Sequence, residues 1–268
     1  MKKMKGLLAA LLLGCIVSTV PANAAGTLNE PISNGRISAA QVQKGDVLHY
    51  QFTVKNTQVL SPLFSTAKIM RIVWTSEGKQ TIVQDIKNRG NGRSYSEELK
   101  IEKGMEPGKW KISSILFLDP QKKIPDISEE KGSLRISEQT KDVVADLSFS
   151  EFMVKGTKAD KKAPTVRKKS MGLTKKKLKN NGKVKFFLKA SDKSSIRYVL
   201  CGWKNSKSKV TSYFAMNYNK KNKRYECTIK KSQLGKKGNS RLVHVKVCDR
   251  YGNLTNLKKK DLPELIIL

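Results

Sequence analysis

Beyond residue 24 of this 268-residue chain, three cysteines and two histidines are the side chains best suited to covalent or acid–base chemistry: Cys201, Cys227, Cys248, His49 and His244. A zinc site needs Cys-x-x-Cys pairs or histidines at ligand spacing, and neither pattern surrounds them. His244 and Cys248 share one face of an expected strand, but no third group is placed to orient a catalytic histidine. These spacings therefore predict neither a metal site nor a catalytic thiol.

The alternation around the cysteines favours one disulfide. Cys201 has the strand parity of Val199, and Cys227 that of Ile229, so both side chains are expected to point into a core. We place their strands in opposing sheets, which makes Cys201–Cys227 the favoured pair in an oxidising compartment. Cys248 falls on the opposite, outward face. The alternative is three unpaired cysteines, two of them packed as small apolar side chains.

The carboxylates do not suggest an acid–base or calcium site. Asp249 and Asn253 could begin a calcium loop, but Arg250 and Lys246 beside them oppose a dication, so a turn-forming Asp is favoured. Residues 159–268 contain 6 Asp+Glu, too few to suggest paired catalytic carboxylates. Because no cofactor motif is present either, we predict a non-enzyme with no cofactor.

Excess positive charge is the strongest chemical signal. Residues 25–158 hold 20 Lys+Arg against 16 Asp+Glu, whereas residues 159–268 hold 31 against 6. So large an excess on about 110 residues opposes compaction and exceeds what solubility requires. We therefore predict a polyanion-binding surface built from the clustered cations Lys175, Lys176, Lys177, Lys179, Lys183, Lys185, Lys220, Lys221, Lys223, Arg224, Lys230, Lys231, Lys236, Lys237, Lys258, Lys259 and Lys260.

The kind of cation indicates the kind of partner. Lysine greatly outnumbers arginine in these clusters, which favours diffuse attraction over bidentate recognition of single phosphates. Aromatic contact surface is expected from Trp203, Tyr213, Phe214, Tyr218 and Tyr251, although some of them must be core. The expected partners are cell-wall polymers, anionic lipid headgroups or acidic glycans, with nucleic acid expected only as extracellular DNA, and a protein partner is assigned to the first domain. Two other functions remain open: a structural spacer without a specific ligand, and an envelope enzyme or inhibitor.

The elements that must position these residues are short strands. Apolar and polar residues alternate in "GDVLHYQFTVKN" (45–56) and "NGKVKFFLKASD" (181–192), and each follows a turn. "IMRIVWTSEGK" (69–79) aligns with "IRYVLCGWKNSK" (196–207), so that Trp74 faces Cys201 in the alignment. The chain therefore repeats one plan, and an all-β fold of two tandem sandwiches is predicted, over residues 25–157 and 158–268. The residues expected to fill the first core are Trp74, Trp110, Phe52, Leu99 and Leu116, and those expected to fill the second are Phe186, Leu188, Val199, Tyr225, Ile229, Val243, Val245 and Val247.

Two further stretches, "GKWKISSILFLDPQKKI" and "LVHVKVCDRYGNL", show a long strand running into a turn, and "FSEFMVKGTKADKKAPTV" links them. These features resemble the tandem immunoglobulin-like or fibronectin-III-like β-sandwich domains of bacterial exported and cell-surface proteins. The resemblance implies two such domains placed end to end and a bacterial, non-catalytic surface protein.

The first residues predict export. Lys2, Lys3 and Lys5 precede an apolar run too short to span a bilayer, and small residues prepare cleavage between Ala24 and Ala25. This order is that of a secretory signal peptide, residues 1–24. A lipoprotein anchor at Cys15 is the alternative, but the apolar run continues past that cysteine. No later segment is long enough for a transmembrane span, so a secreted or cell-surface protein is expected.

Overall fold

The structure is a computed structural model that describes residues 31–55, 67–90, 92–118, 134–136, 145–179, 182–206, 211–234, 238–257 and 262–267. In these ranges the chain is all-β, as predicted, and its two short 3-10 turns are η1 (Ser148–Ser150) and η2 (Lys231–Gln233). None of the described segments is a helix able to cross a membrane. The predicted signal peptide, with Cys15, Ala24 and Ala25, lies outside the described residues.

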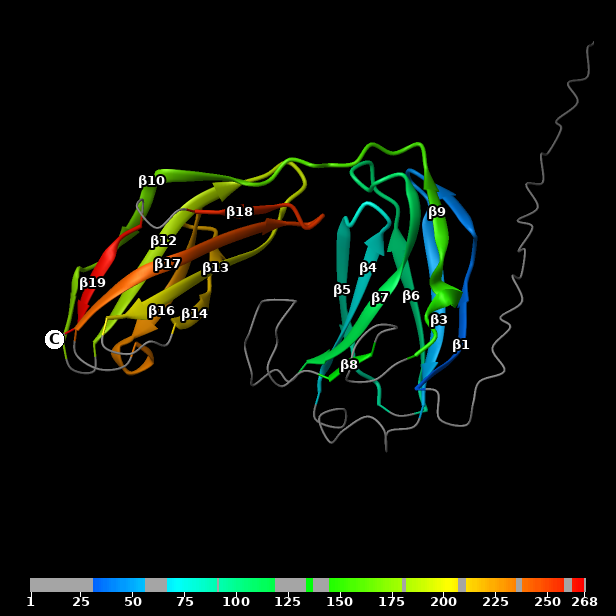
Figure 1. Cartoon of the computed structure of the whole chain (residues 1–268), viewed down its shortest axis with the longest axis horizontal. Helices are drawn as coiled ribbons and strands as arrows, with labels where there is room; N and C mark the ends of the chain where they lie inside the picture. The colour runs from blue at the N-terminus through cyan, green and yellow to red at the C-terminus, as the bar shows by residue number, and fades with distance from the viewer. Residues whose placement is uncertain are drawn as a thin grey trace, which may run out of the picture.

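The N-terminal half, residues 31–155, contains two sheets (Figure 1). Three antiparallel strands form the smaller sheet, in the order β1 (Ile32–Ile37), β3 (Val47–Val54) and β6 (Ser94–Lys100). The larger sheet has the order β2 (Gln41–Gln43), β9 (Phe152–Lys155), β7 (Gly108–Leu118), β4 (Ile69–Ser76) and β5 (Thr81–Lys87), with β8 (Leu134–Ile136) also paired to β7.

The C-terminal half, residues 165–267, repeats this arrangement with one added strand (Figure 1). Its smaller sheet has the order β10 (Thr165–Leu173), β12 (Lys183–Ser191), β16 (Arg224–Lys230) and β15 (Asn217–Asn219). Its larger sheet has the order β11 (Lys177–Leu178), β19 (Glu264–Ile267), β17 (Gly238–Asp249), β13 (Ile196–Asn205) and β14 (Thr211–Ala215), and β18 (Leu254–Asn256) pairs with β17.

The two halves share an uncommon detail of pairing. In each half, a short strand near the start of the half pairs in parallel with the last strand: β2 with β9, and β11 with β19. All the other strand pairs in the described residues are antiparallel. The sequence repeat therefore corresponds to a repeated strand order.

Each half closes over its own apolar cluster, to which the facing sheets both contribute. The predicted core residues Trp74, Trp110, Phe52, Leu99 and Leu116 are all buried in the N-terminal half. In the C-terminal half Phe186, Leu188, Val199, Ile229, Val245 and Val247 are buried, and Tyr225 is partly buried. Alternation of period two was sufficient to find these positions because one face of every strand must leave water.

A β-bulge changes the predicted facing of one strand. The pairing of β13 with β17 shifts register between Gly202 and Trp203. Gly202 lies opposite His244 and Trp203 opposite Leu242, so Val243 is the extra residue of the bulge. Leu242 is buried in place of Val243, which was predicted to be core and is only partly buried. One extra residue in a ladder inverts the faces beyond it.

The same bulge occurs in the N-terminal half and corrects the alignment of the two copies. The pairing of β4 with β7 shifts between Val73 and Trp74, which oppose Ser114 and Ile112. Trp74 therefore corresponds to Trp203, the residue after the shift, and not to Cys201 as the sequence alignment had it. Both tryptophans are fully buried.

Candidate functional site

Positive charge collects on the outer face of the smaller C-terminal sheet. Along β12, Lys183, Lys185 and Lys189 are exposed, while the residues between them are buried or half-buried. The register places Lys183 opposite Lys230 of β16, and Lys189 opposite Arg167 of β10. Directly opposed residues of an antiparallel pair project to the same side. We call the surface formed by Arg167, Lys183, Lys185, Lys189, Arg224 and Lys230 the basic face.

An aromatic ring and a single carboxylate lie within the basic face. The Arg224 guanidinium carbon lies 3.8 Å from the centre of the Phe187 ring, a cation–π contact. Arg224 Nε also donates to Glu226 Oε1 at 2.6 Å, and Lys185 Nζ lies 3.7 Å from Glu226 Oε2. The hydrogen bond from Arg224 is the main cause that lowers the pKa of Glu226 to about 2. Glu226 thus stays charged and forms ion pairs with two of the cations around it, Lys185 and Arg224.

The remaining predicted cations are dispersed. Lys220, Lys221 and Lys223 form the turn between β15 and β16, and Lys231 begins η2. Lys175, Lys176 and Lys179 flank β11, which includes Lys177, at an edge of the larger sheet. The basic face adds two cations that the sequence prediction missed, Arg167 and Lys189. Lys236, Lys237, Lys258, Lys259 and Lys260 lie outside the described residues.

Several aromatic residues expected to offer contact surface are buried. Trp203, Phe214 and Tyr251 are core residues, whereas Tyr213 and Tyr218 are each 51% exposed. The Tyr213 ring stacks on His244, with ring centres 6.0 Å apart. Two exposed tyrosines, neither on the basic face, are what remains of the predicted aromatic surface in the described residues.

The turn of residues 249–253 connects the two halves. Tyr251 is 4% exposed and belongs to the apolar cluster of the N-terminal half, where its hydroxyl donates to Glu102 at 3.2 Å. Arg250 forms an ion pair with Glu102 at 2.7 Å. A side chain at Gly104 would come within 2.5 Å of the Tyr251 ring, so the glycine makes room for it. The turn that carried the family resemblance therefore reaches into the other half.

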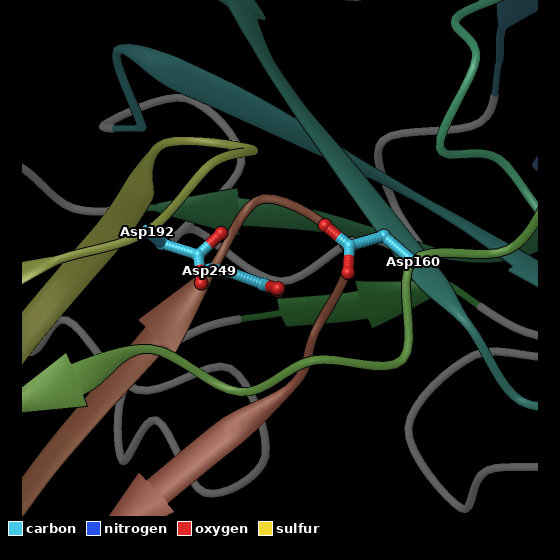
Figure 2. A group of neighbouring side chains, drawn as sticks. All are labelled: Asp160, Asp192 and Asp249. Atoms are coloured by element: carbon cyan, nitrogen blue, oxygen red, sulfur yellow. The ribbon is translucent and has the colours of Figure 1, made fainter.

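Three carboxylates converge beside this turn (Figure 2). Oxygen atoms of Asp160, Asp192 and Asp249 all lie within 4.8 Å of one another. Asp249 Oδ1 accepts from the backbone N–H groups of Tyr251 and Asn253, at 2.9 and 2.8 Å. Asp249 thus shapes the turn, as the sequence predicted, but the approach of the other two aspartates was not foreseen.

Burial and the nearby charge of Asp192 raise the pKa of Asp249, although its hydrogen bonds act in the opposite direction. The Asn253 side-chain amide also links the two sides of the junction. Its nitrogen donates both to Asp249 Oδ2 at 2.7 Å and to the Asp160 carbonyl at 2.8 Å. The acidic cluster therefore sits within a network of hydrogen bonds between the linking segment and the C-terminal half.

The cysteines are arranged partly as predicted. Cys201 and Cys227 lie on strands of facing sheets, and their sulfur atoms are 3.6 Å apart. Cys248 is buried, at 4% exposure, and is not exposed as predicted, although it lies outside the core cluster that contains Val245 and Val247.

The two histidines contact a carboxylate and an aromatic ring. His49 Nδ1 lies 3.4 Å from Glu98 on the exposed face of the smaller N-terminal sheet. His244 packs against Tyr213 and opposes Gly202. Neither contact supplies the nucleophile that an imidazole base would activate.

Comparison with known proteins does not identify a family for the chain. No family model and no curated protein matches it. Among solved structures, latent dimeric PorU from Porphyromonas gingivalis aligns with 87% of this chain and 23% of its own, at 10% identity and a TM-score of 0.27. A leucine-rich repeat protein from Bacteroides thetaiotaomicron aligns with 72% of this chain and 22% of its own, at 15% identity and a TM-score of 0.18. The chain thus spans under a quarter of either structure, and at these TM-scores neither informs its fold or function.

Proposed function

We propose that this protein is an exported, non-catalytic binding or adhesion protein made of two tandem immunoglobulin-like sandwiches. Its C-terminal sandwich docks electrostatically on an anionic polymer or surface, which is a cell-wall polymer, an anionic lipid layer or an acidic glycan. Its N-terminal sandwich, with nearly balanced charge, is presented to a protein partner. The basic face is the docking surface.

The carrying observation is the register of the smaller C-terminal sheet. It places Lys183 directly opposite Lys230, and Lys189 directly opposite Arg167. Like charges at opposed positions destabilise an antiparallel pair. A lysine of this sheet does not require a cation as its cross-strand partner, since Lys185 lies opposite the neutral residue Thr228. Retaining opposed cations is favourable where an anionic partner neutralises them.

The chemistry of the face fits an extended polyanion better than one discrete anion. Lysine ammonium groups are flexible point charges, which suit a flexible polymer with repeating negative charge. Association would release counterions, so the affinity should fall steeply as salt rises. Arg224 stacked on Phe187 contributes a rigid, partly apolar element at the centre.

Heparin is a suitable first probe because it is a soluble anionic polysaccharide. The full chain should bind it at 20 mM salt, with an affinity that falls at least tenfold by 200 mM. The quadruple variant with Lys183, Lys185, Lys189 and Lys230 changed to Gln should bind more weakly and reduce the slope of log K against log salt by about three.

The matched control removes the same charge from the N-terminal half, with Lys44, Lys55, Lys68 and Lys100 changed to Gln. All four are exposed. Equal loss of binding in both variants would contradict a specific basic face and leave only net charge. If the unchanged protein binds neither heparin, nor wall polymer, nor vesicles of anionic phospholipid, the spacer function becomes the better account.

A further inference from the structure

Two buried thiols face each other inside the C-terminal half. Cys201 is on β13 of the larger sheet and Cys227 on β16 of the smaller one, and their sulfur atoms are 3.6 Å apart. Cys201 is fully buried and Cys227 is 8% exposed. A disulfide needs a sulfur separation near 2.05 Å, so the two sulfurs have to approach by about 1.6 Å. Side-chain rotations are the natural source of that movement because both groups already point at each other.

The surroundings suit a structural bridge better than a reactive thiol. Both cysteines belong to the apolar cluster with Phe186, Trp203 and Val245. Burial, followed by the neighbouring thiol of Cys227, raises the pKa of Cys201 well above its usual range. Redox-active cysteines instead have lowered pKa values and partial exposure. Once formed, a bridge in this position would be shielded from exchange with thiols in solution.

Cys248 is not equivalent to the other two. It is buried where β17 ends, its sulfur lies 3.5 Å from the Asp249 carbonyl, and it is not part of the cluster that contains the pair. The N-terminal half has no cysteine at all, and its corresponding core is filled by larger aromatic and aliphatic side chains. The cysteine pair is thus specific to the C-terminal half, since the same strand order forms a core in the N-terminal half without cysteines.

We propose that Cys201 and Cys227 form an inter-sheet disulfide in the mature protein, and that Cys248 remains a thiol. The oxidant is a disulfide of a small molecule or of a protein oxidase. One cysteine attacks it as a thiolate, forming a mixed disulfide and releasing one thiol. The second cysteine then attacks the mixed disulfide, forming the bridge and releasing the second thiol. Two electrons pass to the oxidant, and two protons leave the cysteines to end on its thiols.

Because both sulfurs are buried, the exchange should occur during folding rather than in the native state. The test therefore refolds the full chain, carrying Cys15→Ser so that only three cysteines remain, in oxidised and reduced glutathione. We expect one alkylatable thiol after unfolding in denaturant, and mass spectrometry of tryptic peptides should join the Cys201 peptide to the Cys227 peptide. Three alkylatable thiols, or a bridge that includes Cys248, would overturn the proposal.

Stability gives an independent readout. The bridge closes a loop of 26 residues, so oxidised protein should melt on the order of 10 °C higher than reduced protein. Cys248→Ala should keep this difference between oxidised and reduced protein, and Cys201→Ala and Cys227→Ala should each abolish it. A variant that fails to refold is replaced by its Ser counterpart. Equal melting of the oxidised and reduced unchanged protein, despite a mapped bridge, would show that it does not support the fold.

Discussion

The two halves of the molecule share a strand order and differ in what they place on the outside of it. On the smaller N-terminal sheet, His49 opposes Glu98 and the side chains approach to 3.4 Å. On the smaller C-terminal sheet, Lys183 opposes Lys230. Inward positions determine how the sheets close, whereas outward positions are free to carry another task. In this chain one copy of the plan keeps its charges balanced and the other accumulates one sign.

The largest expected effect concerns the residue that crosses between the halves. Tyr251 belongs to the C-terminal sequence but is buried in the N-terminal cluster. Tyr251→Ala should destabilise the N-terminal half by about 3 kcal/mol, because it removes a buried ring and leaves a cavity. Denaturant unfolding followed by tryptophan fluorescence, in a Trp203→Phe background that leaves only Trp74 and Trp110 of the N-terminal half, measures the change.

Tyr218→Ala is the matched control, since that ring is 51% exposed. We expect it to change stability by less than about 0.5 kcal/mol. Similar losses in the two variants would mean that Tyr251 does not couple the halves.

The next largest difference is expected between the two equivalent tryptophans, Trp74 and Trp203, when each is replaced by Phe. Trp74 Nε1 donates to Gln84 Oε1 at 2.8 Å, whereas Trp203 Nε1 is buried with no hydrogen-bond partner among the described residues. Trp74→Phe should therefore cost about 1 kcal/mol more than Trp203→Phe, since only the first change breaks a hydrogen bond. Gln84 Oε1 keeps a second donor, the Tyr50 hydroxyl at 3.1 Å. Thermal unfolding of both variants provides the comparison. A larger loss for Trp203→Phe would contradict the hydrogen-bond assignment.

A smaller effect is expected at the carboxylate of the basic face. The pKa of Glu226 is lowered to about 2, so its contribution to stability is present above the unfolded value near 4.5. This contribution should be lost as pH falls through 2. Glu226→Gln should be less stable than the unchanged protein at pH 7 and equal to it near pH 1.5. Chemical denaturation across this range measures the difference, and a pH-independent gap would rule out the ionised carboxylate as its cause.

The same variant tests the proposed docking surface. Removing this one negative charge should tighten heparin binding by about twofold at low salt, because only Coulomb attraction changes. Weaker binding would instead indicate that Glu226 is needed to position Arg224 and Lys185.

The smallest effect is expected in the acidic cluster at the junction. The pKa of Asp249 is raised by burial and by the charge of Asp192. A raised carboxyl pKa favours the folded protein at low pH, and this advantage is lost as pH rises through the unfolded value to the folded one. Asp192→Asn should lower the pKa of Asp249, measurable by NMR titration of the carboxyl carbon, and should weaken that pH dependence. An unchanged titration would show that burial alone is responsible.

Alternation along the chain was enough to predict the all-β fold and most of the core. Phe186, Leu188 and Ile229 were identified because a strand with one buried face must alternate. The same rule predicted that Lys183 and Lys185 would share an exposed face, and it brought Cys201 towards Cys227. One failure lies at a register shift: Val243 was assigned to the wrong face because a bulge leaves no signal in the local pattern. The other is Cys248, which is buried although its place in the alternation is that of Lys246.

The sequence by itself determined the charge of each half, the period of its strands and the repetition of the plan, because these depend on residue types and local spacing. Only the tertiary structure decided which cations oppose one another, how three aspartates from three segments meet, and that Tyr251 belongs to the core of the other half. These outcomes depend on strand register and on contacts between residues up to 149 positions apart, which local physical chemistry does not specify.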